Sequence, residues 1–280
     1  MSKVRIAIAG DIHDCWSETD CELLEKLRPD GVLFVGDLSE GDLSVVQSIS
    51  NLSLPIAVIL GNHDRGKFNK GGFLRSQLSI LGEKHVGWSL KDWVVPPLCV
   101  VGGRPCSSGG GFFLSREVFE VFGDVSLDES ARRIVSCSLE ADPSKPLILL
   151  SHSGPSGLGS SASSLCGRDW KTPSIDWGDN DLALAISQIQ KFRTPELVVF
   201  GHMHHQLKTN YANRSTFHLD SCGTAYLNTA CVPRRFTNDS GINICHFSWV
   251  EFDNMKLKSV CHRWFTDNGE IAYEQILLDR

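Results

Sequence analysis

Five short polar segments follow apolar runs along the chain, and they carry the side chains that could do chemistry. They are Asp11-Ile12-His13, Gly36-Asp37, Gly61-Asn62-His63-Asp64, His152, and Gly201-His202-Met203-His204. A polar group that is buried without a partner costs about 1–3 kcal/mol, so such residues are poor choices for a core. Their repeated occurrence after apolar runs therefore indicates one shared site.

The residue types in these segments are those of a metal centre. Carboxylate, imidazole and amide donors suit divalent ions such as Mn²⁺, Fe²⁺ and Zn²⁺. The segments offer too many ligands for one ion, and Asp37 has no polar neighbour of this kind in sequence. We therefore expect Asp37 to bridge two ions, an arrangement that stabilises both the attacking and the leaving oxygen of a phosphoryl transfer.

The first three segments follow predicted strands over residues 4–10, 31–35 and 55–60, with helices predicted between them. The first helix starts near Thr19, with Glu22 completing a capping box, and the second covers residues 43–52. Alternating strands and helices predict a parallel sheet. Ligands of such sheets bind beyond the carboxyl ends of the strands, where these polar segments fall.

The same pattern returns in the second half. Strands over residues 146–150 and 196–200 precede the last two segments, and helices are predicted over 73–81, 126–140 and 181–192. The middle also holds predicted strands at 93–95 and 98–103. Residues 224–231, 242–252, 257–266 and 270–277 are all predicted strands, with turns at 238–241 and 267–269. No linker interrupts residues 1–280, so we expect a single α/β domain with two sheets packed face to face and helices outside.

Composition excludes several classes of protein. The formal charge of −6 argues against nucleic acid as the main partner, which normally needs a basic surface. A small phosphorylated substrate is compatible with this charge, because metal ions supply positive charge locally. The ten cysteines form no C-x-x-C pair and are interpreted as free thiols of a reducing compartment.

No signal-peptide pattern and no apolar stretch near the ~20 residues of a membrane span is found, so we expect no membrane partner. The expected location is the cytoplasm, or the chloroplast or another organelle if a transit peptide precedes this chain. The oligomeric state is not predicted.

The ordered series Asp11-x-His13, Gly36-Asp37, Gly61-Asn62-His63-Asp64, His152 and Gly201-His202-x-His204 resembles the calcineurin-like metallophosphoesterase superfamily over about residues 4–205. The resemblance implies a four-layer α/β/β/α sandwich with two mixed β-sheets. It also implies that one metal is held by Asp11, His13 and His204, and the other by Asn62, His152 and His202, with Asp37 bridging.

The resemblance further implies a catalytic pair. His63 would stabilise the transition state or protonate the leaving oxygen, and Asp64 would orient or tune His63, as a carboxylate does for an imidazole. The protein Ser/Thr phosphatases of this superfamily carry an Arg soon after the second-motif Asp and a Glu after the third-motif His. Neither is present here, which argues against protein phosphatase activity. Residues 152–159 resemble a little-characterised plant and cyanobacterial branch.

Two arginines are candidates for substrate binding. Arg65 follows the His63-Asp64 pair and Arg104 follows a predicted strand, and arginine binds phosphate oxygens in bidentate fashion. Arg168 and Lys171 also follow His152, but ordinary surface charge explains them better. The Gly- and Ser-rich residues 154–167 form either a lid or a plain loop.

We therefore expect a phosphoesterase with two divalent ions, Mn, Fe or Zn, in which a metal-bound hydroxide attacks a phosphate mono- or diester. The alternative is a catalytically weak binding or scaffold protein on the same fold. The complete ligand set favours the enzyme.

Overall fold

The structure is a computed structural model, and it describes residues 3–66, 70–208 and 212–280. Residues 1–2, 67–69 and 209–211 of the predicted domain lie outside this description. Within it, no helix is both long enough and apolar enough to cross a membrane. All ten cysteines are free.

The first third of the chain forms three parallel strands joined by helices, as predicted. Strands β1, β2 and β3 lie side by side in this order. The elements are β1 (Val4–Ala9), α1 (Glu18–Leu27), β2 (Gly31–Phe34), α2 (Leu43–Ser50), β3 (Ile56–Val58), α3 (Gly72–Leu81) and a 3₁₀ helix (Gly82–Lys84).

The middle of the chain builds a second sheet with the strand order β4-β5-β6-β7-β9-β8. Its central strands β5, β6, β7 and β9 are parallel. The elements are β4 (Leu90–Trp93), β5 (Leu98–Gly102), α4 (Arg116–Phe122), α5 (Leu127–Glu140), β6 (Leu147–Leu150), α6 (Asn180–Ile189), β7 (Leu197–Phe200), β8 (Phe217–Leu219) and β9 (Ala225–Asn228).

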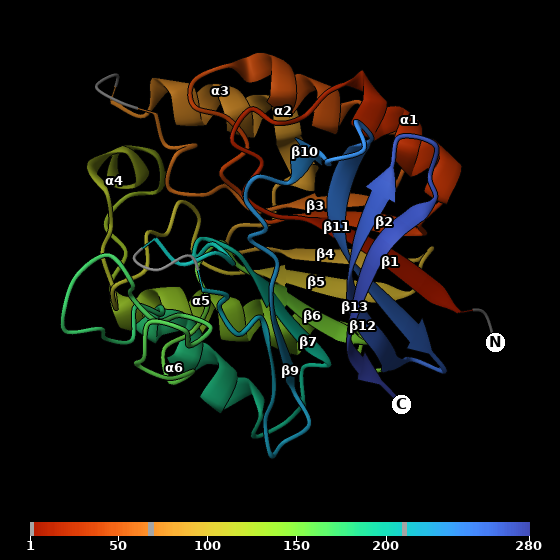
Figure 1. Cartoon of the computed structure of the whole chain (residues 1–280). Coiled ribbons are helices and arrows are strands. Elements are labelled where there is room, and N and C mark those ends of the chain that lie inside the picture. The colour runs from red at the N-terminus through yellow and green to blue at the C-terminus, as the bar shows by residue number, and fades with distance from the viewer. Residues whose placement is uncertain (1–2, 67–69, 209–211) are drawn as a thin grey trace.

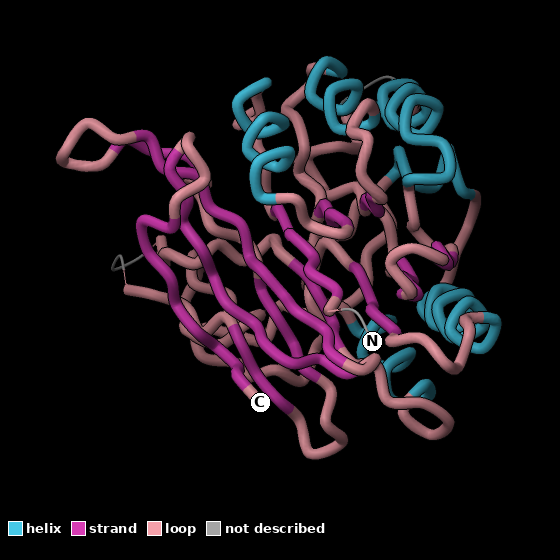
Figure 2. Tube along the Cα trace, turned by 90° about the vertical axis from the view of Figure 1, so that its right-hand side faces the viewer, coloured by secondary structure: helices cyan, strands magenta, loops and turns pink. Residues whose placement is uncertain are grey.

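The end of the chain returns to the first sheet. Strands β10 (Arg235–Thr237), β11 (Asn243–Asp253), β12 (Lys256–Thr266) and β13 (Ile271–Asp279) are all antiparallel to their neighbours. Because β11 pairs with β1, the first sheet has the order β13-β12-β11-β1-β2-β3, with β10 beside β11. Figure 2 shows these long strands side by side.

Two separate apolar cores divide the molecule into layers. Along β1, Ile6 and Ile8 pack between the sheets, whereas Ala7 and Ala9 belong to the core that includes α1 and α2. Residues alternate in this way because successive strand side chains point to opposite faces. Helices α1–α3 lie on one side of the two sheets and α5 and α6 on the other (Figure 1). The fold is therefore mixed α/β with two mixed sheets and outer helices, as the resemblance implied.

Several local predictions were wrong, and the short strands β8 and β10 were not predicted. Helix α1 is capped by Ser17 with Asp20, not by Thr19 with Glu22, so its capping box lies two residues earlier. The strand predicted over residues 93–95 ends at Trp93, since Val94 and Val95 are 79 % and 80 % exposed in the turn before β5. Helix α4 was not predicted, because its seven residues are too few for a clear helical period.

Candidate metal centre and active site

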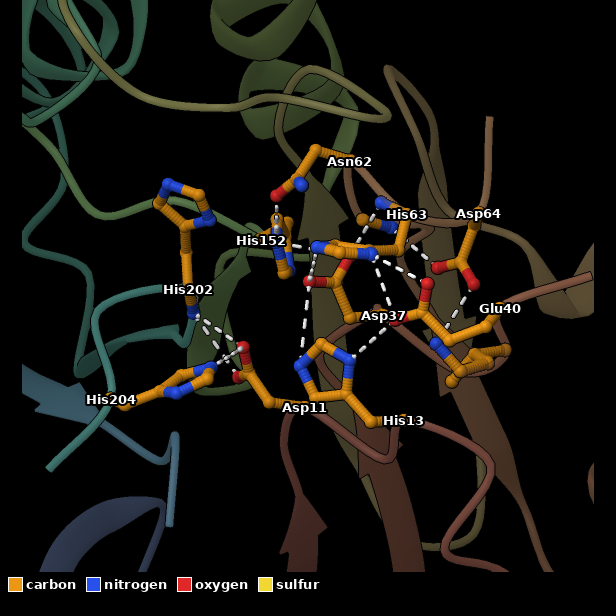
Figure 3. Close-up of polar contacts among 12 residues, drawn as sticks. Asp11, His13, Asp37, Glu40, Asn62, His63, Asp64, His152, His202 and His204 are labelled. Carbon is orange, nitrogen blue, oxygen red and sulfur yellow. Dashed lines mark hydrogen bonds and ion pairs between the residues drawn. The ribbon is translucent and has the colours of Figure 1, made fainter. Parts of the chain in front are cut away.

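The polar segments meet where strands of the two sheets end. Asp11 and His13 follow β1, Asp37 follows β2, and Asn62 follows β3, while His152 follows β6 and both His202 and His204 follow β7. Figure 3 shows the side chains of all seven converging on one place. The expectation that they form one cluster is thus met by the arrangement of the two sheets.

Unusual backbone conformations aim these side chains. Asp11, His13, Asp37 and His202 all have positive φ, between 46° and 67°. Positive φ is uncommon for residues other than glycine, and such strain tends to occur at functional sites. Two glycines also leave room for carboxylates: a Cβ on Gly61 would overlap Asp37 Oδ1, and one on Gly201 would overlap Asp11 Oδ2.

The structure brings together three groups of candidate ligands whose ligand atoms lie within 4.8 Å of one another. One of them, His13, Asp37 and His63, shares His13 with the first group below and Asp37 with the second. The first group is Asp11, His13 and His204, and the second is Asp37, His152 and His202. Asn62 joins the second group, because its Oδ1 lies 3.0 Å from His152 Nε2. These groups contain the residues that the resemblance assigns to each ion, and the assignment of each residue to an ion stays a prediction.

Asp37 lies between the two groups. Its Oδ1 is 3.4 Å from His152 Nε2, and its Oδ2 is 3.8 Å from His13 Nε2. One carboxylate oxygen thus faces each group, and the carboxylate is almost fully buried. This is the placement that a bridging ligand requires.

The donor atoms fit divalent cations. His13 Nε2 is buried and has no hydrogen-bond partner, so it is available as a ligand. Burial lowers the pKa of His202 to about 3 and the pKa of His204 to about 4, so both imidazoles are neutral at pH 7. A neutral imidazole is the form that binds a metal.

The carboxylates and His152 form a tightly coupled charge cluster. Burial opposes charge on His152, but the carboxylates of Asp37 and Asp11 raise its pKa to about 10. Burial likewise opposes charge on Asp37, yet the charges of His152 and His63 hold the pKa of Asp37 below its usual range. To bind a metal ion, His152 would therefore have to lose a proton. Its other nitrogen, Nδ1, is 2.7 Å from the Val35 carbonyl oxygen, and this contact fixes the orientation of the ring.

His63 lies at the edge of the cluster, but its partner is not the predicted one. Its Nδ1 is 2.9 Å from Oε2 of Glu40, and the other Glu40 oxygen, Oε1, is 3.0 Å from Nδ1 of the ligand His13. Hydrogen bonds from both rings hold the pKa of Glu40 below its usual range, against the effect of its partial burial. Glu40 was missed in the sequence, although its place three residues after Asp37 could have suggested it.

Asp64, predicted to orient His63, is instead a structural brace. Its Oδ1 accepts hydrogen bonds from the backbone amides of Leu38 and Ser39, at 2.8 and 3.1 Å. Its Oδ2 accepts from the amide of Gly61, at 2.7 Å. The side chain is fully buried and ties the loop after β2 to the loop after β3. The prediction that Asp64 orients His63 is therefore wrong, since Glu40 and not Asp64 contacts the ring.

The two arginines proposed for substrate binding have different positions. Arg104 is buried away from solvent, where it pairs with Asp179 at 2.7 Å and with Asp181 at 3.1 Å. These ion pairs occupy its guanidinium, so the prediction of a substrate role for Arg104 is wrong. Arg65 is half-buried and lines a hollow of about 410 Å³ together with Glu40, Asn62, His63 and Phe73.

Arg168 and Lys171 lie outside the ligand cluster, as expected of surface charge. Arg168 donates to the Pro173 carbonyl oxygen, and Lys171 is exposed. Residues 154–167 form a loop that is tied down by Arg214, whose Nη1 donates to the carbonyl oxygens of Ala162, Ser164 and Gly167. These bonds favour a fixed loop over a lid.

A second hollow, of about 590 Å³, is also lined by His63. It is lined by His13, Asp37, His202 and His204 and continues to Trp170, Trp177 and Lys208. His63 lines both hollows, so both reach the cluster and leave room for a substrate beside it.

Solved structures with the same fold are distant in sequence. The protein TT1561 of Thermus thermophilus is 13 % identical, with 92 % of this chain and 98 % of that chain covered and a TM-score of 0.53. GAP50 of Plasmodium, described as the anchor in the inner membrane complex, is 12 % identical, with 100 % and 90 % covered and a TM-score of 0.56. No curated protein sequence matches the chain.

A model of the calcineurin-like phosphoesterase family matches residues 4–206, which hold every candidate ligand described above. The match covers well over half of the chain, and the ligand types, their order and their convergence at one place agree with it. The chain therefore belongs to the calcineurin-like phosphoesterase family and is a metal-dependent hydrolase of phosphate esters.

Proposed function

We propose that this chain hydrolyses a small phosphate mono- or diester at a dinuclear centre of Mn, Fe or Zn ions. Asp11, His13 and His204 would hold one ion, Asn62, His152 and His202 would hold the other, and Asp37 would contribute a carboxylate oxygen to each. The observation that carries the proposal is the position of Asp37, whose two carboxylate oxygens face the two ligand groups at 3.4 and 3.8 Å. Two bound divalent ions supply an activated water and neutralise charge on the phosphoryl oxygens.

His63 has the position of a proton donor to the leaving oxygen. Its Nδ1 is engaged by Glu40, while its Nε2 points toward the cluster, 3.9 Å from Asp37 Oδ2. The side chain is 43 % exposed, so a substrate can reach the ring. Glu40 is a positioning residue, since it orients both His63 and the ligand His13.

The test combines metal content with phosphate release. Protein loaded with Mn²⁺ is expected to hold two ions per chain and to release the alcohol or phosphate from an aryl phosphate monoester or a bis-aryl diester. Asp37→Asn is expected to lower turnover by at least about a hundredfold, the range for loss of a group that acts on the transition state. Asp239→Asn, an exposed aspartate of the turn between β10 and β11, is the matched control.

Unchanged turnover in Asp37→Asn would contradict the bridging role. Binding of a single ion per chain by the native protein would contradict the dinuclear centre. The choice between monoester and diester follows from which of the two substrates has the higher kcat/KM.

The second candidate is a binding or scaffold protein on the same fold. GAP50, which has the same fold, is described as an anchor. One fold can serve unrelated functions, so a binding role is the second candidate for this chain. Two bound ions together with no hydrolysis of either ester would support this candidate.

We also propose a reducing compartment such as the cytoplasm, which the ten free cysteines support.

A further inference from the structure

Two tryptophans with no role in the metal centre stand in the same hollow as the ligands. Trp170 and Trp177 line the hollow of about 590 Å³ that also contains His202 and His204. Their ring centroids are 5.3 Å apart and the rings lie at 77° to each other. The hollow has the size of a pocket for a small molecule, about 300–1,000 Å³.

Trp177 is held in a fixed position. Its indole Nε1 donates to the Ser108 carbonyl oxygen at 2.9 Å, and its own carbonyl oxygen accepts from the Gly110 amide at 2.6 Å. The backbone of Gly109 and Gly110 lies against the ring, where an added Cβ would come within 2.6 and 2.9 Å of indole atoms. This side of the hollow is therefore formed before any ligand binds.

Trp170 stands against this support and presents its surface to the hollow. It is 44 % exposed, although Trp177 packs against it and the Lys208 ammonium lies 5.7 Å from its ring centroid. Leaving much of an indole in water forgoes the free energy of burying it, about 25 cal/mol for each Å². A flat apolar ligand group that covers Trp170 recovers this free energy.

The charges around the two tryptophans limit the charge of the ligand group that can bind beside them. Arg168 lies over Trp177, with its guanidinium carbon 5.2 Å from the ring centroid, and Lys208 lies near Trp170. Asp169 lines the hollow together with the two tryptophans. Its carboxylate accepts a hydrogen bond from the Lys208 backbone amide at 2.6 Å and lies 3.6 Å from the Arg214 guanidinium. With cations already beside both indoles and that carboxylate paired, a cationic group such as choline is disfavoured.

We propose that Trp170 and Trp177 form a subsite for a planar aromatic or heteroaromatic ring on the organic part of the substrate, as in a nucleoside or aryl phosphate. This inference rests on the proposed function, because it places the phosphate of the same molecule at the metal cluster. Stacking on an aromatic side chain is sequence-tolerant among bases, so the subsite selects a ring and not one particular base.

The test compares two phosphate esters, one with an aromatic base and one without it. Adenosine 5′-monophosphate and ribose 5-phosphate carry the same phosphate linkage, with and without a base, and phosphate release from each is measured with the Mn²⁺-loaded full chain. If diesters are the preferred class, the methyl diesters of the same two compounds take their place. We expect kcat/KM to be at least about tenfold higher for the compound with the base, in line with the contribution of one stacked base.

Two variants assign the preference to the tryptophan. Trp170→Leu is expected to remove most of the difference between the two compounds, which a general loss of activity would not do. Phe192→Leu is the matched control, since Phe192 is 47 % exposed after α6 and does not line the hollow. It is expected to keep the native ratio.

Binding of adenosine, measured by calorimetry, separates this inference from the proposed function. Adenosine carries no phosphate, so a dissociation constant that weakens about tenfold in Trp170→Leu supports the subsite even if no ester is hydrolysed. Equal kcat/KM for both compounds, no adenosine binding to the native protein, or a preference for phosphocholine would each overturn the subsite, while phosphate release would still support the phosphoesterase.

Discussion

The role of Asp64 as a brace can be separated from the contacts that Glu40 makes with two histidines. Both carboxylates lie near His63 in the site (Figure 3), but one accepts from backbone amides and the other contacts two imidazoles. Replacing each with its amide leaves the shape of the side chain nearly unchanged. Asp64→Asn should therefore lower stability, and Glu40→Gln should lower turnover.

The magnitude for Asp64→Asn follows from its three hydrogen bonds. An amide has one oxygen, so its NH₂ group faces at least one of the amide donors of Gly61, Leu38 and Ser39. An unsatisfied buried donor costs about 1–3 kcal/mol, and the remaining bonds lose the extra strength that a charged acceptor gives. We expect a total loss of about 2–5 kcal/mol, which lowers the melting temperature by roughly 3–9 °C in a chain of this size.

The assay is thermal unfolding of both variants beside kcat and KM for one aryl phosphate. The measurements belong at about pH 8, above the pKa of about 7 to which burial and the charge of Asp37 raise the Asp64 carboxyl. Glu40 is 46 % exposed at its side chain, so Glu40→Gln should leave the melting temperature within about 2 °C. Its kcat should fall about 10–100-fold, as for other residues that orient a metal ligand.

The opposite pattern would refute this reasoning. If Asp64→Asn melts like the native protein yet loses turnover, Asp64 acts on the chemistry directly. If Glu40→Gln keeps the native kcat, its contacts with His13 and His63 do not matter for the reaction.

Further predictions concern the arginines, the metals and pH. Arg104→Met should cost about 3–5 kcal/mol by denaturant unfolding, because it leaves two buried carboxylates unpaired, and an increase in KM without this loss would restore its substrate role. Arg65→Gln should raise KM and leave the urea midpoint unchanged; an unchanged KM would assign Arg65 to ordinary surface charge. Chelation of divalent ions should abolish phosphate release, and Mn²⁺ should restore it, whereas full activity after chelation would rule out the metal centre. Burial lowers the pKa of His85 to about 4, below its unfolded value near 6.5. Its contribution to stability is thus present above about pH 6.5 and is lost as the pH falls toward 4, by at most about 1.4 kcal/mol per unit, and unfolding of His85→Gln should depend less on pH.

The sequence by itself determined the parts of the molecule that depend on local pattern. The strands before Asp11, Asp37 and Asn62 are short apolar runs, and the helices between them carry a helical period, so the parallel order β1-β2-β3 could be predicted. The ligand types could be predicted as well, because each follows a strand and parallel strands bring their carboxyl ends to one edge. The family resemblance rests on the same residues.

Only the tertiary structure decided what each neighbouring carboxylate does. Asp64 is adjacent to His63 in sequence but turns inward to the amides of Gly61, Leu38 and Ser39, while Glu40 reaches His63 from another loop. Arg104 likewise finds Asp179 and Asp181, more than seventy residues away. The pairing of β11 with β1 and the meeting of Trp170 with the candidate ligand His202 in one hollow have the same origin. Such contacts depend on how two sheets and their loops pack in space, and periodicity along the chain carries no information about them.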